Sequence, residues 1–298
     1  MTLAPRVVVV HRRTELDGLL DRHGTRGQAE FFLRSRGRTL DSAQVAHDQD
    51  GDALQVVSTS IPEGWRRGGV EREDLHRFPF DDGDIVVIVG QDGLVANVAK
   101  YLNAQPVIGI DPRPGINPGV LVRHRPDVAE QVMAAASKGQ ATIERRTMVQ
   151  ATLDDGQTLI ALNEIFVGHA SHQSARYSLT SPGAHNGERQ SSSGVIVATG
   201  TGATGWCASI AAERGGQLRP PTPTEQSLVW FVREAWPSPA TGTTRTDGLL
   251  DIQEQLRVIA EGENLVVFGD GLEADRLQTT WGQEVTIGVA AQHLHLVV

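Results

Sequence analysis

Four consecutive valines, Val7–Val10, form a short run in which every side chain is apolar. A strand with this pattern must be covered on both faces, which is typical of a parallel sheet with helices packed on either side. Two similar runs follow at Ile85–Val89 and Val107–Ile110. The first half of the chain is therefore predicted to be an α/β domain with a Rossmann-like parallel sheet.

Helical and further strand signals lie between these runs. Residues 14–35 show helical spacing of apolar side chains, interrupted at Gly24 and Gly27, and residues 94–102 show the same spacing. A further strand is predicted at Leu54–Val57, followed by a polar, glycine-rich stretch over 61–84. In sheets of this kind, ligands bind beyond the carboxyl ends of the strands.

The second half of the chain has a different pattern. After a helix predicted over 128–136, short β-branched segments are separated by turns such as Asp-Gly, Pro-Gly and Asn-Gly. We predict a β-rich, mainly antiparallel domain over 127–298, preceded by the α/β domain over 1–126. The predicted strands are 145–152, 158–167, 176–180, 194–199, 247–251, 256–260, 264–268 and 284–289.

Composition limits the classes of partner. A net charge of −9 argues against a nucleic-acid-coating function. No apolar run approaches the roughly 18 residues of a membrane span, and we expect a protein without a membrane partner. The start lacks a signal-peptide pattern, and Cys207 is the single cysteine. We therefore expect a cytoplasmic protein. Exposed strand edges in the β-rich domain lead us to expect a homo-oligomer.

Basic side chains are unevenly distributed. Lys100 and Lys138 are the only lysines, whereas residues 1–40 are rich in arginine. Arginines can bind phosphate bidentately, so this end of the chain could help to hold a phosphorylated ligand. A solvated helix face explains the same pattern and is the more common reason for a run of charges. The arginines of this segment are Arg6, Arg12, Arg13, Arg22, Arg26, Arg34, Arg36 and Arg38.

The first motif is Gly90-Gln91-Asp92-Gly93, directly after the apolar run 85–89 and before the amphipathic segment 94–102. Backbone N–H groups at the start of a helix point toward an anion above the sheet, which makes Gly90, Gln91 and Gly93 candidate phosphate-binding residues. The carboxylate of Asp92 could act there as a base or hold Mg²⁺. An ordinary Asp-Gly turn is the alternative.

The second motif is Asn163-Glu164, which interrupts an apolar stretch. An amide and an acid inside a strand are costly to bury without partners, and ribose hydroxyls would supply such partners. A solvent-facing pair at a strand bend remains the alternative.

The third motif is a loop of glycine and threonine, residues 199–205, which follows the strand 194–199. Its glycines would let backbone N–H groups converge on a phosphate or ribose, and hydroxyls of Thr199, Thr201 and Thr204 would add donors and acceptors. The loop satisfies G-x-G-x-x-G, but no acid lies about 20 residues further on, so the dinucleotide fingerprint is incomplete. The candidate nucleotide-binding residues of this loop are Thr199, Gly200, Thr201, Gly202, Ala203 and Thr204.

Several other chemistries lack support in the sequence. There is no G-x-x-x-x-G-K-[ST] motif, so phosphates would be held by backbone N–H groups and arginines. His169 and His172 are spaced as metal ligands, but without a second cluster we predict no protein-built metal site. No serine lies in a nucleophile elbow, so a hydrolase is not supported.

The three motifs, in this order, resemble those of the NAD kinase family, whose wider relatives include diacylglycerol kinases and phosphofructokinases. In that family a Gly-Gly-Asp-Gly motif supplies the catalytic aspartate, an Asn-Glu motif contacts ribose, and a Thr-Pro-Thr-Gly-Ser-Thr-Ala-Tyr loop wraps the dinucleotide. The resemblance also includes Pro106–Asp111 and Asp270-Gly271. It covers most of the chain from about residue 85.

The chain differs from the family pattern at several positions. Gln91 stands in place of the second glycine of the first motif, Gly200 in place of the proline of the third, and Trp206 in place of its tyrosine. The loop 111–119 replaces the family's Asn-Leu-Gly segment.

The resemblance implies a kinase that uses ATP as phosphoryl donor and Mg²⁺ as cofactor, with NAD or a related nucleotide as acceptor. It implies that Asp92 is the catalytic base, that Asn163 and Glu164 fix ribose, and that residues 199–204 hold the adenosine. Two alternatives stay open: a kinase for a nucleoside, sugar or lipid, and a nucleotide-binding protein in which Gln91 has disabled the donor site. An oxidoreductase is disfavoured because the fingerprint lacks its acid.

Overall fold

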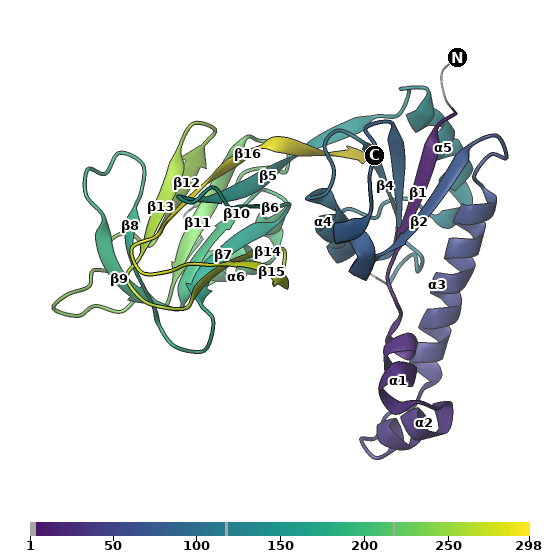
Figure 1. The fold of residues 1–298 in the computed structure, drawn as a ribbon, viewed down its shortest axis with the longest axis horizontal. Coiled ribbons are helices and arrows are strands. Elements are labelled where there is room, and N and C mark those ends of the chain that lie inside the picture. Colours follow the sequence, from purple (N-terminus) through teal and green to yellow (C-terminus); the bar gives the residue numbers. More distant parts are fainter. Residues whose placement is uncertain (1–3, 117–118, 217) are drawn as a thin grey trace. The chain divides into compact units, whose positions relative to one another are not determined.

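The chain forms two compact units in a computed structural model that describes residues 4–116, 119–216 and 218–298 (Figure 1). The first unit comprises residues 1–144 with the last four residues, and the second comprises Arg145–Leu294. The sequence prediction had placed the boundary at 126/127. Helix α5 (Ala129–Ser137) lies on the N-terminal side of the observed division because it packs against strands of the first unit.

The first unit is built on a parallel sheet. Its strand order is β2 (Arg66–Glu71), β1 (Arg6–His11), β3 (Asp84–Val89) and β4 (Pro106–Ile110), with the last residues of β16 (Glu284–Val297) beside β4. Every neighbouring pair in this series is parallel. All six residues of β3 are buried: five are apolar, and the sixth, Asp84, forms an ion pair with Arg6. The predicted α/β class of this unit is confirmed.

Helices cover both faces of this sheet. Helix α3 (Asp41–Thr59) and α5 pack with alternate residues of β1 and β3 through a cluster that includes Val57, Met133, Val9 and Val87. Helix α4 (Asp92–Ala99) lies on the opposite side of the sheet (Figure 1). Two 3-10 helices also belong to the unit, η1 (Arg72–Arg77) and η2 (Pro126–Val128).

The strand predicted at Leu54–Val57 is wrong, because these residues lie inside helix α3. Ala53 and Val57 are buried at a spacing of four residues, which is a helical face that a four-residue apolar run does not reveal. The second strand of the unit in chain order is β2, within the polar, glycine-rich stretch 61–84, where no strand was predicted. Arg66, Arg67 and two glycines give it the sequence of an edge strand, without an apolar run.

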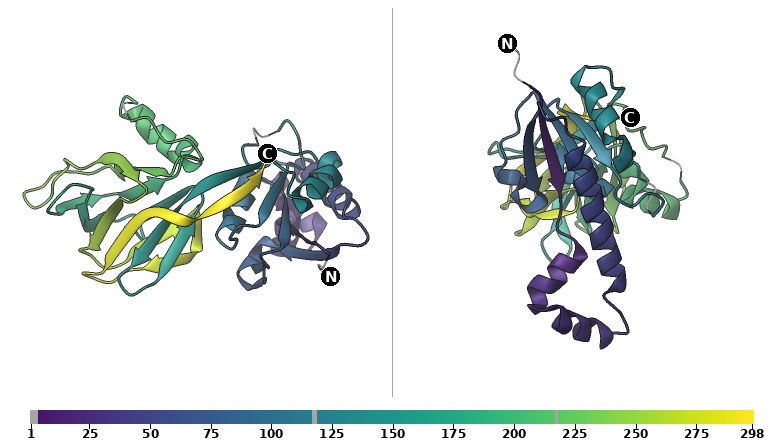
Figure 2. Two further views of the ribbon diagram at one scale, coloured as in Figure 1. Left: turned by 90° about the horizontal axis from the view of Figure 1, so that it is seen from above. Right: turned by 90° about the vertical axis from the view of Figure 1, so that its right-hand side faces the viewer.

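Helices α1 (Glu15–His23) and α2 (Arg26–Arg34) form a small helical cluster at one end of α3 (Figure 2). Thr14 and Asp17 make a capping box at the start of α1, and Thr25 caps α2. Gly24, with φ of 75°, ends α1. The helical spacing predicted over 14–35 and the interruption at Gly24 are confirmed. The interruption predicted at Gly27 is wrong, because Gly27 lies in the first turn of α2.

The second unit is a β-rich structure with two sheets. One sheet is antiparallel throughout, and the other joins β5 and β6 to the strands around β16. The two sheets share one core, which includes Val149, Tyr177, Trp230, Val258 and Val267. The first sheet has the order β12 (Asp247–Asp251), β11 (Ser227–Arg233), β10 (Gly194–Ala198), β7 (Glu164–His169), β14 (Leu265–Gly269) and β15 (Leu272–Gln278); the second contains β16, β13 (Gln255–Ala260), β8 (Ala175–Thr180), β9 (Glu188–Ser192), β5 (Ile143–Leu153) and β6 (Thr158–Ala161).

The predicted β-rich, mainly antiparallel class of the second unit is confirmed. Three of its strands are missing from the prediction, β9, β11 and β15. Strands β9 and β15 are mainly polar. Strand β11 is an apolar run for which the sequence analysis predicted no strand. After η3 (Gly202–Thr204), helix α6 (Trp206–Glu213) covers the outer face of the first sheet through Cys207 and Ile210. No helix within the described ranges is long and apolar enough to cross a membrane.

Candidate active site

Asp92 is the first residue of helix α4, three residues after the end of strand β3. Its carboxylate accepts three backbone N–H hydrogen bonds from one loop. Oδ2 accepts from Val120 at 2.9 Å, and Oδ1 accepts from Leu121 at 2.8 Å and Val122 at 3.0 Å. A carboxylate offers about four acceptor positions, so Oδ2 retains one for a further donor. The side chain is thus fixed in orientation and still able to accept a proton.

Close packing holds the donating loop in place. A Cβ atom on Gly109 of strand β4 would lie 2.2 Å from the carbonyl oxygen of Leu121, so only glycine fits there. Gly119 has a φ of 60°, which also favours glycine. The three donors directly follow the segment 111–119, in which the chain departs from the family pattern and which Gly119 ends. Asn117 and Pro118 of that segment lie outside the described residues.

The rest of the first motif surrounds the start of the helix. Gln91 is the N-cap residue, and its side-chain Oε1 accepts a hydrogen bond of 3.0 Å from Nη2 of Arg12. Gly90 donates its N–H to Ile110, which ties the motif to strand β4. Gly93 is exposed in the first turn, with no atom within 4 Å of the position of a Cβ. The N–H groups of a first turn have no partner within the helix and can bind an anion.

Asn163 and Glu164 lie in the second unit, where strand β7 begins. The carboxylate of Asp270 accepts the backbone N–H groups of Leu162 and Asn163 at 2.9 and 2.7 Å. The N–H of Asp270 is in turn donated to the carbonyl of Glu164 at 3.1 Å. Asp270 therefore fixes the backbone of the Asn-Glu motif from a distant part of the chain.

Glu164 has an unusual ionisation. Burial, with the neighbouring charge of Asp270 as a smaller cause, raises the pKa of Glu164 to about 7. The carboxylate therefore changes charge near neutral pH. Vicinal hydroxyl groups would stabilise its ionised form, because each can donate a hydrogen bond to it.

The glycine and threonine loop is bonded mainly to the protein itself. Thr199 is fully buried, and its hydroxyl donates to the carbonyl of Leu162 at 2.6 Å and accepts from the N–H groups of Thr201 and Gly202. The hydroxyl of Thr201 accepts a hydrogen bond from the buried Arg146 at 3.2 Å. Thr204 is exposed and donates to the carbonyl of Thr201. These hydroxyls fix the loop beside the Asn-Glu motif.

The glycines of the loop allow backbone segments to approach one another. A Cβ on Gly202 would lie 2.2 Å from the carbonyl oxygen of Asn163, and one on Gly200 would lie 2.1 Å from that of Thr222. Ala203 is buried. The small side chains thus bring residues 199–203 against Asn163 and Thr222, a role that their spacing alone did not indicate.

The structure brings the predicted residues together in two groups. Gly90, Gln91, Asp92 and Gly93 lie at the end of β3 in the first unit. The second group, in the other unit, comprises Asn163, Glu164, Thr199, Gly200, Thr201, Gly202, Ala203 and Thr204. The sequence missed the anchoring role of Asp270 and the contact between Arg12 and Gln91, since both join residues that are distant along the chain.

An aromatic stack borders the second group. The ring of Trp206 lies on that of Phe166 with centroids 5.7 Å apart, and the guanidinium of Arg233 lies 4.7 Å from the Trp206 centroid. Trp206 remains 38% exposed. It therefore offers a partly open aromatic surface next to the loop.

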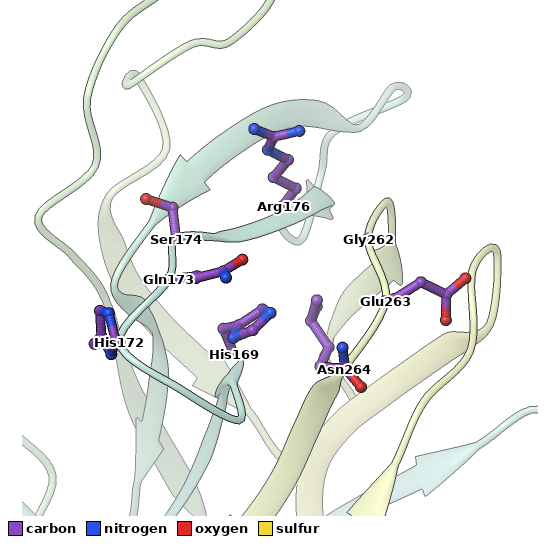
Figure 3. A pocket seen from close by; sticks show the side chains of 9 residues that line it. His169, His172, Gln173, Ser174, Arg176, Gly262, Glu263 and Asn264 are labelled. Carbon is purple, nitrogen blue, oxygen red and sulfur yellow. The ribbon is translucent and has the colours of Figure 1, made fainter.

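A separate pocket of about 490 Å³ contains the two histidines considered as metal ligands (Figure 3). His169 ends strand β7, roughly 16 Å along the strand from Glu164. Its Nδ1 lies 3.1 Å from the backbone N–H of Ser171. Figure 3 shows His172 on the loop that follows this strand. Within the described residues, no group of three or more His, Cys, Asp or Glu side chains is arranged to hold a metal ion.

Comparison with solved structures shows which known folds resemble this one. The fold is similar to that of yeast NADH kinase complexed with NADH, with a TM-score of 0.61, 13% identity, and coverage of 99% of this chain and 84% of that one. It is also similar to an NAD kinase from Archaeoglobus fulgidus in complex with ATP, with a TM-score of 0.58, 20% identity, and coverage of 98% and 93%. No protein-family model matches the chain.

Sequence relatives lead to the same family. The chain is 25% identical to the NAD kinase of Chlorobaculum tepidum, over 92% of this chain and 88% of that protein. It is 27% identical to the NAD kinase of Cutibacterium acnes, over 96% and 83%. The chain is thus similar to NAD kinases over most of its length, at an identity that marks it as a divergent relative of that family.

Proposed function

We propose that this protein is an NAD kinase, which transfers the γ-phosphoryl group of ATP to a hydroxyl group of NAD. The full-length similarity to NAD kinases supports this reaction, and the fold is shared with a kinase complexed with ATP. The observation that carries the proposal for this chain is the carboxylate of Asp92. It is held in a fixed orientation by three N–H donors at the start of a helix, where a base would lie beside a phosphate site.

In the proposed reaction Asp92 accepts the proton of the acceptor hydroxyl, the adenosine 2′-OH of NAD, through the open position on Oδ2. The backbone N–H groups of Asp92 and Gly93 hold the phosphates of the donor. Phosphoryl transfer depends mainly on positioning and on neutralisation of charge, and a fixed carboxylate beside free N–H groups provides the first of these.

Mg²⁺ fits this site as an ion carried on the phosphates of the donor. Magnesium is commonly bound by one or two carboxylates with phosphate oxygens and water, so it does not need a cage of protein ligands. Asp92 is the carboxylate of the motif that could approach it. When bound, the ion would neutralise the charge that develops on the phosphate oxygens.

Recognition of the acceptor is assigned to the second unit. Asn163 and Glu164 would hold ribose hydroxyls, and Trp206 would offer its ring to a base. The buried residues Thr199 to Ala203 would support the adenosine site from the protein side. Thr204 is exposed and would lie at its edge. A cytoplasmic location, a homo-oligomer and the absence of nucleic-acid and membrane partners stay predictions from the sequence.

The proposal is tested by measuring ADP release from ATP and Mg²⁺ with a panel of acceptors, including NAD, NADH, nucleosides, sugars and a diacylglycerol. NAD is expected to give the highest kcat/KM, with NADP as product. A higher value with a nucleoside, sugar or lipid would show that the acceptor is wrong. Binding of NAD without ADP release from any acceptor would contradict the kinase activity itself.

A further inference from the structure

A second pocket lies beside the first motif, in the first unit. It has a volume of about 310 Å³ and opens where strands β1 and β3 end. The carboxyl ends of parallel strands are the usual place for a ligand in such a sheet. The wall includes Gly90 and Gln91, directly before the first turn of α4. Three arginines also line it, Arg12, Arg13 and Arg113.

The three arginines differ in their partners. Arg13 forms an ion pair with Asp21 at 2.5 Å, and Arg113 lies 3.3 Å from Asp50. For Arg12, no carboxylate of the described residues lies within 4.0 Å, and its side-chain hydrogen bond goes to the neutral amide of Gln91. A guanidinium has five N–H donors, so most of those on Arg12 are available. Its positive charge is not neutralised by a direct ion pair.

The neighbouring Asp50 and Arg113 also line this pocket and add one negative and one positive charge to its wall. Both Oδ1 of Asp50 and Nε of Arg113 are buried and lack a hydrogen bond of good geometry. Burial raises the pKa of the Asp50 carboxyl, while Arg113 and Arg12 oppose that rise. The charge of Arg12 therefore acts on this pocket even though it forms no direct pair with Asp50.

We infer that this pocket binds the phosphate chain of the nucleotide donor, with Arg12 as the contacting cation and Gln91 as the positioning residue that holds Arg12 beside the first motif. The inference rests on the proposed kinase function for the identity of the donor. Neither lysine of the chain, Lys100 or Lys138, lines the pocket, so Arg12 supplies the positive charge that a lysine often provides at a phosphate site. The N–H groups of the first turn of α4 continue the same anion site.

This assignment explains the glutamine at position 91. Its amide oxygen accepts a hydrogen bond and orients the guanidinium without cancelling its charge. A glutamate there would form an ion pair with Arg12 and compete with phosphate for it. A glycine would leave Arg12 without its partner. Gln91 is then a feature of donor binding, in contrast to the hypothesis that it disables the donor site.

The test compares Arg12→Ala, Gln91→Glu and Gln91→Gly with Arg34→Ala. Arg34 is exposed on helix α2 and provides a control for loss of one positive charge from the same unit. We expect Arg12→Ala to raise the KM for ATP about tenfold or more, because a charge-assisted hydrogen bond is lost. Gln91→Glu should raise it to a similar extent and Gln91→Gly severalfold, while the KM for NAD stays within twofold. Arg34→Ala should leave both constants unchanged.

A binding measurement separates this inference from the kinase proposal. Inorganic triphosphate should raise the Tm of the wild-type protein in the absence of NAD, and Arg12→Ala should remove most of that rise while the ligand-free Tm stays within a few degrees. If the wild type forms no NADP but shows this difference, the kinase assignment fails and the pocket assignment stands. An equal rise in both proteins, an unchanged KM for ATP in Arg12→Ala, or a lower KM in Gln91→Gly would overturn the pocket assignment.

Discussion

The first motif and the glycine and threonine loop look alike in the sequence, but the structure uses them differently. At the first motif, Asp92 and Arg12 keep polar atoms available after their contacts with the protein are counted. In the loop, the hydroxyl of Thr199 is fully engaged by neighbouring backbone, and Gly202 is pressed against Asn163. The comparison teaches that a glycine-rich loop can serve to bring backbone segments together, with ligand contact left to the residues that it supports.

The largest expected effect is at the first motif. Asp92→Asn should lower kcat for NADP formation about a thousandfold, because the amide cannot accept the proton of the acceptor hydroxyl. The amide keeps only one acceptor oxygen, so its NH₂ group would face either the N–H of Val120 or those of Leu121 and Val122, and some loss of stability is expected. Steady-state kinetics and the Tm measure the two effects. A variant that retains more than a tenth of wild-type kcat would remove Asp92 from the chemistry.

A pair of glycine substitutions tests the contrast between the two regions. Gly202→Ala should lower the free energy of unfolding by about 3 kcal/mol or more, because its Cβ meets backbone at 2.2 Å. Gly93→Ala, where nothing lies within 4 Å, should leave stability unchanged or raise it by about 0.5–1 kcal/mol. Denaturant titration of both variants checks this. Equal destabilisation would contradict the difference between the two regions. Loss of activity in a stable Gly93→Ala variant would support it, because it would place phosphate close to that backbone.

The ionisation of Glu164 should appear as a dependence on pH. Its folded pKa of about 7 lies above the ordinary 4.5, so the folded state binds more protons than the unfolded state between these values. Stability therefore falls as pH rises through this window, by up to about 3 kcal/mol. Glu164→Gln should flatten that slope.

Binding provides the complementary readout for Glu164. If ribose hydroxyls donate to the ionised carboxylate, the affinity for NAD should increase between pH 6 and 8 in the wild type. Calorimetric titration of the wild type and Glu164→Gln over this range measures it. The same pH dependence in both proteins would exclude Glu164 as its source.

The smallest effect is expected at the exposed end of the loop. Thr204→Val removes one exposed hydrogen bond and should change the unfolding free energy by about 0.5 kcal/mol or less. Thr199→Val removes a buried hydroxyl with three partners and should cost about 2–3 kcal/mol. Thermal denaturation of the two variants measures both changes in unfolding free energy. Similar costs would mean that the hydroxyls do not differ as described.

Sequence patterns were most informative where a segment's own residues determine its structure. The buried strands β1, β3 and β4 were predicted because each is apolar on both faces, and the break between α1 and α2 because Gly24 ends a helix. The order of the motifs also pointed to the family of the sequence relatives, the NAD kinases.

The remaining features depend on partners far along the chain. Strand β2 is arginine- and glycine-rich because it lies at an edge, and 54–57 is helical because Ala53 and Val57 face the core. The hydrogen bonds from Leu162 and Asn163 to Asp270 join positions separated by more than a hundred residues, and no local pattern contains that information.

The most direct test of the central claim is the fate of the γ-phosphoryl group of ATP. Wild-type protein with labelled ATP, Mg²⁺ and NAD should place the label on the adenosine 2′-hydroxyl, giving NADP and ADP in equal amounts. Label found only in inorganic phosphate, or in another acceptor in preference to NAD, would contradict the account.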